Sequence, residues 1–174
     1  MNRRRAIGTG VASLAALAIP GGMAAQDEAG AIEMVAGGGA VETALGLVDF
    51  GLVARANEDG SVTGSLTLRD FTQPGNPVVM QSTQFNRLEV PSGDSPGARE
   101  LVGWVSAGGS TVLFLLHVDD VDGPGSGEDV FRLYVGEAAA PFFDGDEQSA
   151  CDCADYSYAI EGQVVQGDIL VVPG

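Results

Sequence analysis

The sequence predicts an all-β protein, either an antiparallel β-sandwich or a flattened barrel of about nine or ten strands. Short apolar or alternating runs recur at intervals of about 8–12 residues and are joined by turns rich in Gly, Pro, Asn and Asp. Outside the N-terminal segment, no window of ten or more residues shows helical periodicity. A chain of 174 residues with 45% apolar content is long enough for one domain with a core of its own.

Ten runs are candidates for the strands. Residues 64–71 alternate with a period of two, with Leu66 and Leu68 on one face, which indicates a half-buried strand. Residues 111–118 are apolar on both faces, which indicates a central strand covered on both sides. Residues 78–83 and 85–90 form two strands or one bent strand. The candidates are residues 31–36, 47–56, 64–71, 78–83, 85–90, 101–106, 111–118, 130–135, 156–162 and 167–172.

Residues 1–25 resemble an export signal. Three arginines are followed by an apolar stretch, by Pro20 and Gly21, and by small residues up to Ala25, after which we expect cleavage. The pair Arg4 and Arg5 partly matches a twin-arginine signal, and a Sec signal with a basic start fits equally well. No later run reaches the roughly 20 residues of a membrane-spanning helix. We therefore expect a secreted or cell-surface protein, with residues 26–174 as its single domain.

The expected mature chain is strongly acidic. Without residues 1–25 it keeps five arginines, no lysine and 24 acidic residues, a formal charge of −19. Such a surface repels nucleic acids and anionic lipids, so neither is an expected partner. Cations are favoured, and the expected partners are a divalent cation and a cell-surface protein or glycan. A saline habitat and a GC-rich coding bias both explain the composition.

The only cysteines, Cys151 and Cys153, are separated by one residue. In an exported protein they suggest a disulfide, although so small a ring is strained. Free thiols are the second interpretation. A metal site is the third, because two thiolates are too few and the only histidine, His117, is remote in sequence.

The densest group of candidate ligand side chains lies in the hairpin at residues 119–135. Its five carboxylates flank a Gly/Pro-rich turn and supply the oxygen ligands that calcium prefers. Residues 124–132 match one copy of a nonapeptide calcium repeat, with Pro in place of the first Gly. The alternative is a solvated hairpin whose acids only keep the sheet soluble. The candidate calcium ligands are Asp119, Asp120, Asp122, Glu128 and Asp129.

A loop at residues 137–155 is the second candidate site, because loops of this length are uncommon unless they function or are disordered. Aromatic side chains beside carboxylates can form a sugar-binding platform, and the candidates are Phe142, Phe143, Asp144 and Asp146. The alternative is that the two phenylalanines cap one end of the fold, and that Tyr156 and Tyr158 belong to the last strands.

Enzymatic activity has little support. The chain contains no G-x-S-x-G, no H-E-x-x-H and no P-loop. His117 sits within an apolar strand, where a structural role is more common than membership of a catalytic triad. A pair of carboxylates for glycoside cleavage stays open, because their separation cannot be read from the sequence.

Four segments together resemble the secreted bacterial domains of the post-COAP type. They are FGLVARANEDGSVTGSLTLRD, VVMQSTQFNRLEV, VDDVDGPGSGEDVFRLYV and YAIEGQVVQGDILVV, and the resemblance spans residues 47–172. It implies an exported all-β module, often attached to larger surface proteins, with no established catalysis. The cysteine-containing insert at residues 138–155 departs from that pattern.

These observations favour a non-catalytic exported module for surface adhesion or assembly, with calcium as an optional stabiliser. The alternative is a carbohydrate-binding module, or a weak glycan-active enzyme, that uses the 138–155 loop. A third interpretation is a structural subunit that pairs through its edge strands.

Overall fold

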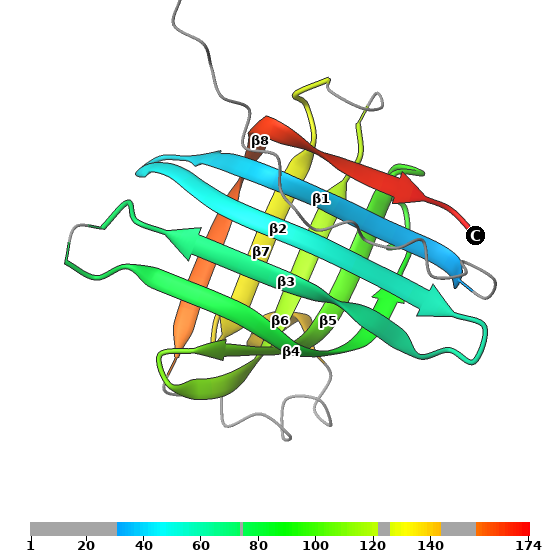
Figure 1. Ribbon diagram of the computed structural model, residues 1–174, viewed down its shortest axis with the longest axis horizontal. Helices are drawn as coiled ribbons and strands as arrows, with labels where there is room; N and C mark the ends of the chain where they lie inside the picture. Colours follow the sequence, from blue (N-terminus) through cyan, green and yellow to red (C-terminus); the bar gives the residue numbers. More distant parts are fainter. Residues whose placement is uncertain (1–30, 74, 122–125, 144–155) are drawn as a thin grey trace, which may run out of the picture.

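The computed structural model describes residues 31–73, 75–121, 126–143 and 156–174, so the predicted export signal lies outside it. Eight antiparallel strands form a closed barrel in which each strand pairs with the next along the chain and the last returns to the first (Figure 1). The strands are β1 (Ala31–Thr43), β2 (Gly46–Asn57), β3 (Val62–Asp70), β4 (Val78–Glu89), β5 (Ala98–Ala107), β6 (Ser110–Asp119), β7 (Val130–Gly136) and β8 (Ser157–Val172).

The all-β prediction and its barrel alternative are confirmed, but the count of nine or ten strands is wrong. β4 is a single strand with two register shifts, whereas the sequence also allowed two separate strands in this region. β8 is a single strand that continues through the residues expected to form a turn before Gly167. β1 likewise continues through three glycines expected to end it. Because the barrel closes, no described strand is a free edge along its whole length. The third interpretation, a subunit that pairs through its edge strands, stays a prediction.

Glycines allow the barrel to close between β1 and β8. A Cβ on Gly39 would lie 1.7 Å from the carbonyl oxygen of Gln166, and one on Gly167 would lie 1.9 Å from that of Gly38. Gly167 also adopts a φ of +91°, which other residues rarely tolerate. It lies in the half of β8 that pairs with β1, beyond the bend that begins at Gln163, where the partner of the strand changes from β7 to β1. These glycines therefore form a close-packed seam rather than turns.

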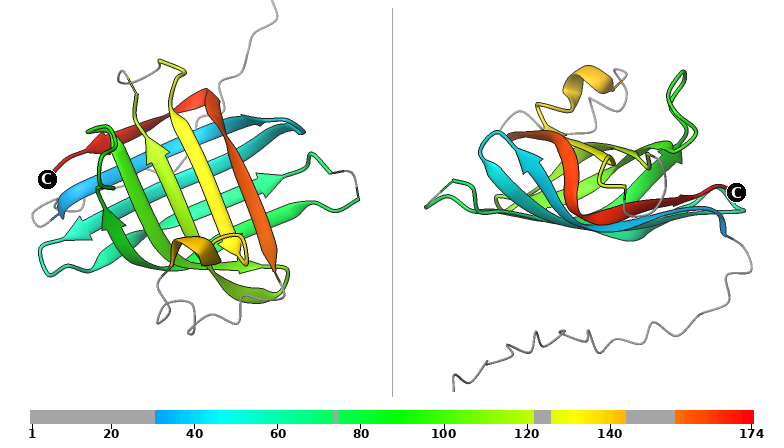
Figure 2. Two further views of the ribbon diagram at one scale, coloured as in Figure 1. Left: turned by 180° about the vertical axis from the view of Figure 1, so that it is seen from behind. Right: turned by 90° about the horizontal axis from the view of Figure 1, so that it is seen from above.

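The interior of the barrel is filled with side chains. Inward-facing residues from all eight strands form one core cluster that includes Phe50 and Phe131, whose ring centroids lie 4.6 Å apart. The two layers of strands cross steeply, with β1–β4 in front of β5–β7, and β8 passes from one layer to the other (Figures 1 and 2). An eight-stranded barrel of this kind is just wide enough for its own side chains.

A second apolar cluster lies on the outside of the barrel. Leu113 and Leu115 on β6 pack there with Val102 of β5 and with Phe143, which follows the short 3-10 helix η1 (Ala140–Phe142). This segment covers the outer face of β6, so the prediction of a strand buried on both faces is confirmed for residues 112–118, whereas Thr111 is exposed. Trp104 packs at this outer cluster and not in the barrel interior.

Candidate ligand pocket at the mouth of the barrel

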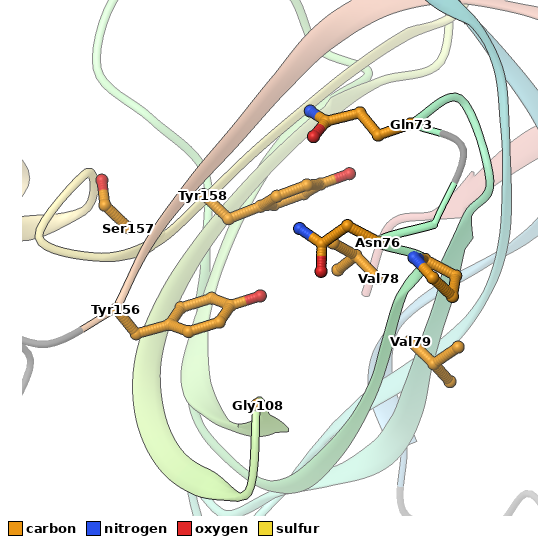
Figure 3. A pocket seen from close by; sticks show the side chains of 9 residues that line it. Gln73, Asn76, Val78, Val79, Gly108, Tyr156, Ser157 and Tyr158 are labelled. Carbon is orange, nitrogen blue, oxygen red and sulfur yellow. The ribbon is translucent and has the colours of Figure 1, made fainter.

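A pocket of about 420 Å³ opens at the end of the barrel where the β3–β4 and β5–β6 turns meet the start of β8 (Figure 3). Its volume is typical of small-molecule sites. The hydroxyls of Tyr156 and Tyr158 point toward the side formed by Gln73 and Asn76. The complete lining is Gln73, Asn76, Pro77, Val78, Val79, Gly108, Tyr156, Ser157 and Tyr158.

Tyr158 is held by a buried carboxylate. Its hydroxyl donates a 3.0 Å hydrogen bond to Oδ2 of Asp70, and Oδ1 of Asp70 accepts from the backbone N–H and the hydroxyl of Thr72 at 2.8 and 2.7 Å. Asp70 is the inward-facing last residue of β3 and is only 5% exposed. Burial opposes its ionisation, but the hydrogen bonds from Thr72 and Tyr158 outweigh burial and lower its pKa. Burial and the Asp70 hydrogen bond together raise the pKa of Tyr158 far above its ordinary value.

Tyr156 is positioned by backbone contacts. Its carbonyl accepts a 2.8 Å hydrogen bond from the N–H of Glu137, and its ring lies against Gly108 in the β5–β6 turn. A Cβ on Gly108 would come within 3.3 Å of that ring, so glycine leaves room for it. The hydroxyl of Tyr156 forms no hydrogen bond with another residue in the described ranges.

The lining suits a polar, uncharged ligand group. Gln73 and Asn76 each offer an amide donor and an acceptor, and the two tyrosine hydroxyls can accept as well as donate. The tyrosine rings add apolar surface that can stack on a sugar or aromatic ring. None of the lining residues carries a charge, so a hydroxylated ligand group matches the pocket better than an anion does.

The predicted aromatic platform of the 138–155 loop does not line this pocket. Phe143 is 9% exposed and belongs to the outer cluster, whereas Phe142 is 52% exposed and packs on Tyr134 with ring centroids 4.6 Å apart. Both phenylalanines lie on the outer face of the barrel, so they do not cap one end of the fold as the alternative predicted. Sugar binding by the 138–155 loop stays a prediction. Asp144, Asp146, Cys151 and Cys153 lie outside the described residues.

The acidic hairpin joins β6 to β7 and therefore lies at the opposite end of the barrel. Its described carboxylates accept hydrogen bonds from their neighbours: Asp120 from the N–H of Val171 at 3.0 Å, and Asp119 from the hydroxyl of Ser95. The second oxygen of Asp120, Oδ1, is buried and accepts no hydrogen bond within the described residues. Glu128 is exposed, and Asp122 lies outside the described residues.

Asp129 has a structural role at the end of the barrel that carries the acidic hairpin. Its oxygens accept from the N–H groups of Val121 and Ile169 at 3.1 and 2.8 Å, and its carbonyl accepts from Val164, so it fastens the β6–β7 connection to the bend of β8. Burial raises its pKa, and the nearby carboxyl of Asp168 raises it further. No group of three or more acidic, histidine or cysteine side chains in the described ranges is arranged to hold a metal ion. Calcium binding stays a prediction.

Two pocket features were missed at the sequence level, although signals for them exist. Asp70 continues the inward face of Leu66 and Leu68, so a carboxylate on an apolar face was visible in the alternation. The convergence of the polar β3–β4 loop with Gly108 and the tyrosines follows from the order of strands, because every second turn of an up-and-down barrel lies at the same end. His117 faces outward on β6, within 4 Å of Asp94 and Glu100 and away from the pocket lining.

The fold and the pocket together define an up-and-down β-barrel with a polar hollow at one mouth. Comparisons with protein-family models, with curated proteins and with solved structures find no match to this chain. The resemblance to the post-COAP-type domains therefore stays a prediction. No helix in the described part of the chain is long and apolar enough to cross a membrane.

Proposed function

We propose that this protein is a non-catalytic exported binding module that holds a hydroxylated ligand, a surface glycan, at the mouth of its barrel. The observation that carries the proposal is the pocket of about 420 Å³, in which two tyrosines and two side-chain amides converge on one space. Donors, acceptors and ring faces in one neutral hollow are what sugar recognition needs. This keeps the carbohydrate-binding prediction but moves it from the 138–155 loop to Tyr156 and Tyr158.

The protonation states support binding rather than catalysis. Asp70 has a lowered pKa and is held by three hydrogen bonds, so near neutral pH it is a fixed carboxylate. Tyr158 has a raised pKa and stays protonated. General acid–base catalysis needs a group that titrates near the working pH. Neither of these groups meets that requirement.

A glycan array of neutral and amino-bearing oligosaccharides, followed by calorimetric titration of the best binder, tests the proposal. We expect Tyr156→Ala to reduce affinity by about tenfold, because it removes one ring face and one hydroxyl from the pocket, and tenfold corresponds to about 1.4 kcal/mol. Phe142→Ala is the matched control, since it removes an exposed aromatic ring outside the pocket. Loss of binding in the control and not in Tyr156→Ala would place the site on the 138–155 loop instead.

We also propose calcium as an optional stabiliser of the acidic hairpin, for which the buried, unbonded Oδ1 of Asp120 is the supporting observation. A ligand that binds only the folded state raises the unfolding midpoint. Thermal unfolding in EGTA, in millimolar calcium and in millimolar magnesium distinguishes the cases. We expect a rise that is selective for calcium. An equal rise with magnesium would show screening of the acidic surface alone and would end the proposal.

A further inference from the structure

The first half of β8 has an unpaired edge. β1 pairs with β8 only from Gln163 onward, so among the described strands residues 157–162 of β8 pair with β7 alone. Figures 1 and 2 show this half of β8 as the outermost strand of the layer that it forms with β5–β7. An unpaired edge presents a row of backbone N–H and C=O groups to which a further strand can bond.

Alternate residues of this edge direct their backbone groups away from β7. The carbonyl of Tyr156 accepts from the N–H of Glu137, and the N–H of Val164 donates to the carbonyl of Asp129. Glu137 and Asp129 flank β7, so the even-numbered residues of this half of β8 face β7. Successive residues of an antiparallel strand face opposite sides. The backbone groups that point to the unpaired side are therefore those of Ser157, Ala159 and Glu161.

The space beside this edge is a second pocket, of about 390 Å³. Residues 157–161 of β8 form one wall, and residues 43–45 of the β1–β2 turn form another. The end of β3 and the loop after it complete the lining with Asp70, Thr72 and Gln73. No described segment fills the gap between β8 and the turn, so an extended chain can lie along β8 there.

The side chains beside the edge define the chemistry of such a guest strand. A guest residue opposite Ala159 has its side chain on the exposed outer face, because directly opposed residues of antiparallel strands share a face. Its two neighbours point inward, toward Tyr158 and the buried Ile160, where β-branched apolar side chains pack well. An acidic guest is disfavoured, because the chain has a formal charge of −16 and no basic residue lines the pocket.

We propose that the first half of β8 binds an extended segment of a partner protein as an added antiparallel strand. The segment alternates polar and β-branched apolar residues and contains no acidic residue. Its backbone hydrogen bonds to the edge supply the affinity, and its inward side chains supply the specificity. This assigns a second class of ligand to a second pocket, so it goes beyond the proposed function and does not depend on it.

Amide hydrogen exchange of the full chain, followed by NMR, tests the proposal with a synthetic probe. The probe is an acetylated and amidated heptapeptide that alternates threonine and valine and ends in lysine. In the free protein, Tyr158 and Ile160 should exchange more slowly than Ala159 and Glu161, because only the first two donate to β7. We expect the probe to slow exchange at Ala159 and Glu161 by about tenfold or more, because their N–H groups gain hydrogen bonds.

Two N-methylated forms of the probe are matched controls. Methyl groups on the threonines remove the N–H donors that face β8, so this form should bind at least about tenfold more weakly. Methyl groups on the valines remove donors that face away from β8, so this form should keep most of the affinity. Ala159→Pro, which removes one N–H from the edge, should also weaken the unmodified probe. The two methylated forms are compared on the wild-type protein, so they test the proposal even if proline disturbs the barrel.

The remaining outcomes distinguish the possible occupants of the edge. Equal weakening by both methylation patterns, or no slowing of exchange at Ala159 and Glu161, would overturn the proposal. Slow exchange at these two residues in concentrated free protein that is lost on dilution would overturn it in favour of a second copy of this chain. Slowing by the best oligosaccharide of the glycan array, and not by the probe, would overturn it in favour of a glycan. If the probe binds as expected and no oligosaccharide binds, the strand site stands and the proposed function fails.

Discussion

At the scale of single residues, the hydrogen bond from Tyr158 to Asp70 connects a residue of the pocket lining to a buried residue of β3. We expect Tyr158→Phe to lower the free energy of unfolding at pH 7 by about 1.5–3 kcal/mol, the range measured for hydrogen bonds to charged groups. The pKa of Asp70 is lowered in the folded state, so this contribution is present at neutral pH and is lost as the pH falls through the folded pKa. Urea unfolding at pH 7 and below pH 4 measures the difference.

Tyr156→Phe is the matched control for that experiment, because the Tyr156 hydroxyl forms no hydrogen bond with another described residue. We expect its stability to stay within about 0.5 kcal/mol of the wild type at both pH values. A loss in Tyr156→Phe equal to that in Tyr158→Phe would show that the carboxylate is not the cause.

The buried carboxyl of Asp129 predicts the opposite dependence on pH. Its pKa is raised in the folded state, so the stability that its protonated form contributes is lost as the pH rises through that value. Asp168→Asn removes the neighbouring charge and should raise the unfolding midpoint at pH 7 by a few degrees. The gain should shrink as the pH falls through the folded pKa of Asp129, because its protonated carboxyl is no longer repelled by the neighbouring charge. If the rise in the unfolding midpoint does not change with pH, its cause is packing and not the charge of Asp168.

At the scale of elements, the glycine seam between β1 and β8 closes the barrel. We expect Gly167→Ala to lower the free energy of unfolding by more than about 3 kcal/mol, because its Cβ would lie 1.9 Å from the carbonyl oxygen of Gly38. Gly93→Ala is a close control: its φ of +87° nearly equals the +91° of Gly167, but a Cβ there meets no atom within 4 Å. Its cost should be only the conformational strain of about 1–2 kcal/mol. If denaturant unfolding shows that the two substitutions lower the free energy of unfolding equally, the steric explanation of barrel closure is wrong.

The segment after β7 acts as a cover for the outer face of β6. Phe143→Ala should destabilise the protein by about 3–5 kcal/mol, the usual cost of emptying a buried aromatic site. Phe142→Ala should cost about 1 kcal/mol, since that ring is half exposed and touches Tyr134. Thermal unfolding of the two variants measures both values. A larger effect of Phe142 than of Phe143 would contradict the packing described here.

Much of this architecture could be predicted from the alternation of residues along the chain. The inward face of β3 and the double burial of β6 follow directly from period-two patterning. The closure could not be predicted, because Gly37 and Gly39 favour a turn in sequence and act as a seam only when β8 lies beside them. The same limit applies to the pocket, since Asp70 and Tyr158 are 88 positions apart and meet only through the order of the strands.

At the scale of the whole molecule, the acidic hairpin and the polar pocket lie at opposite ends of the barrel. The acidic hairpin uses Asp120 and Asp129 to fasten β8, whereas the mouth presents tyrosines and amides to solvent. This division explains why the strongest motif in the sequence need not mark the ligand site. The carboxylates of Asp120 and Asp129 accept hydrogen bonds that hold β8, and the polar side chains of the mouth come from the β3–β4 loop and the start of β8.

The central claim, that the ligand binds at the mouth, is tested most directly by amide NMR of the full chain titrated with the oligosaccharide that binds best on the glycan array. We expect the perturbed amides to be those of Gln73, Asn76, Gly108, Ser157 and Tyr158. Perturbations concentrated instead on Val121, Ile169 and Val171 would place the ligand at the acidic end of the barrel and would contradict the claim.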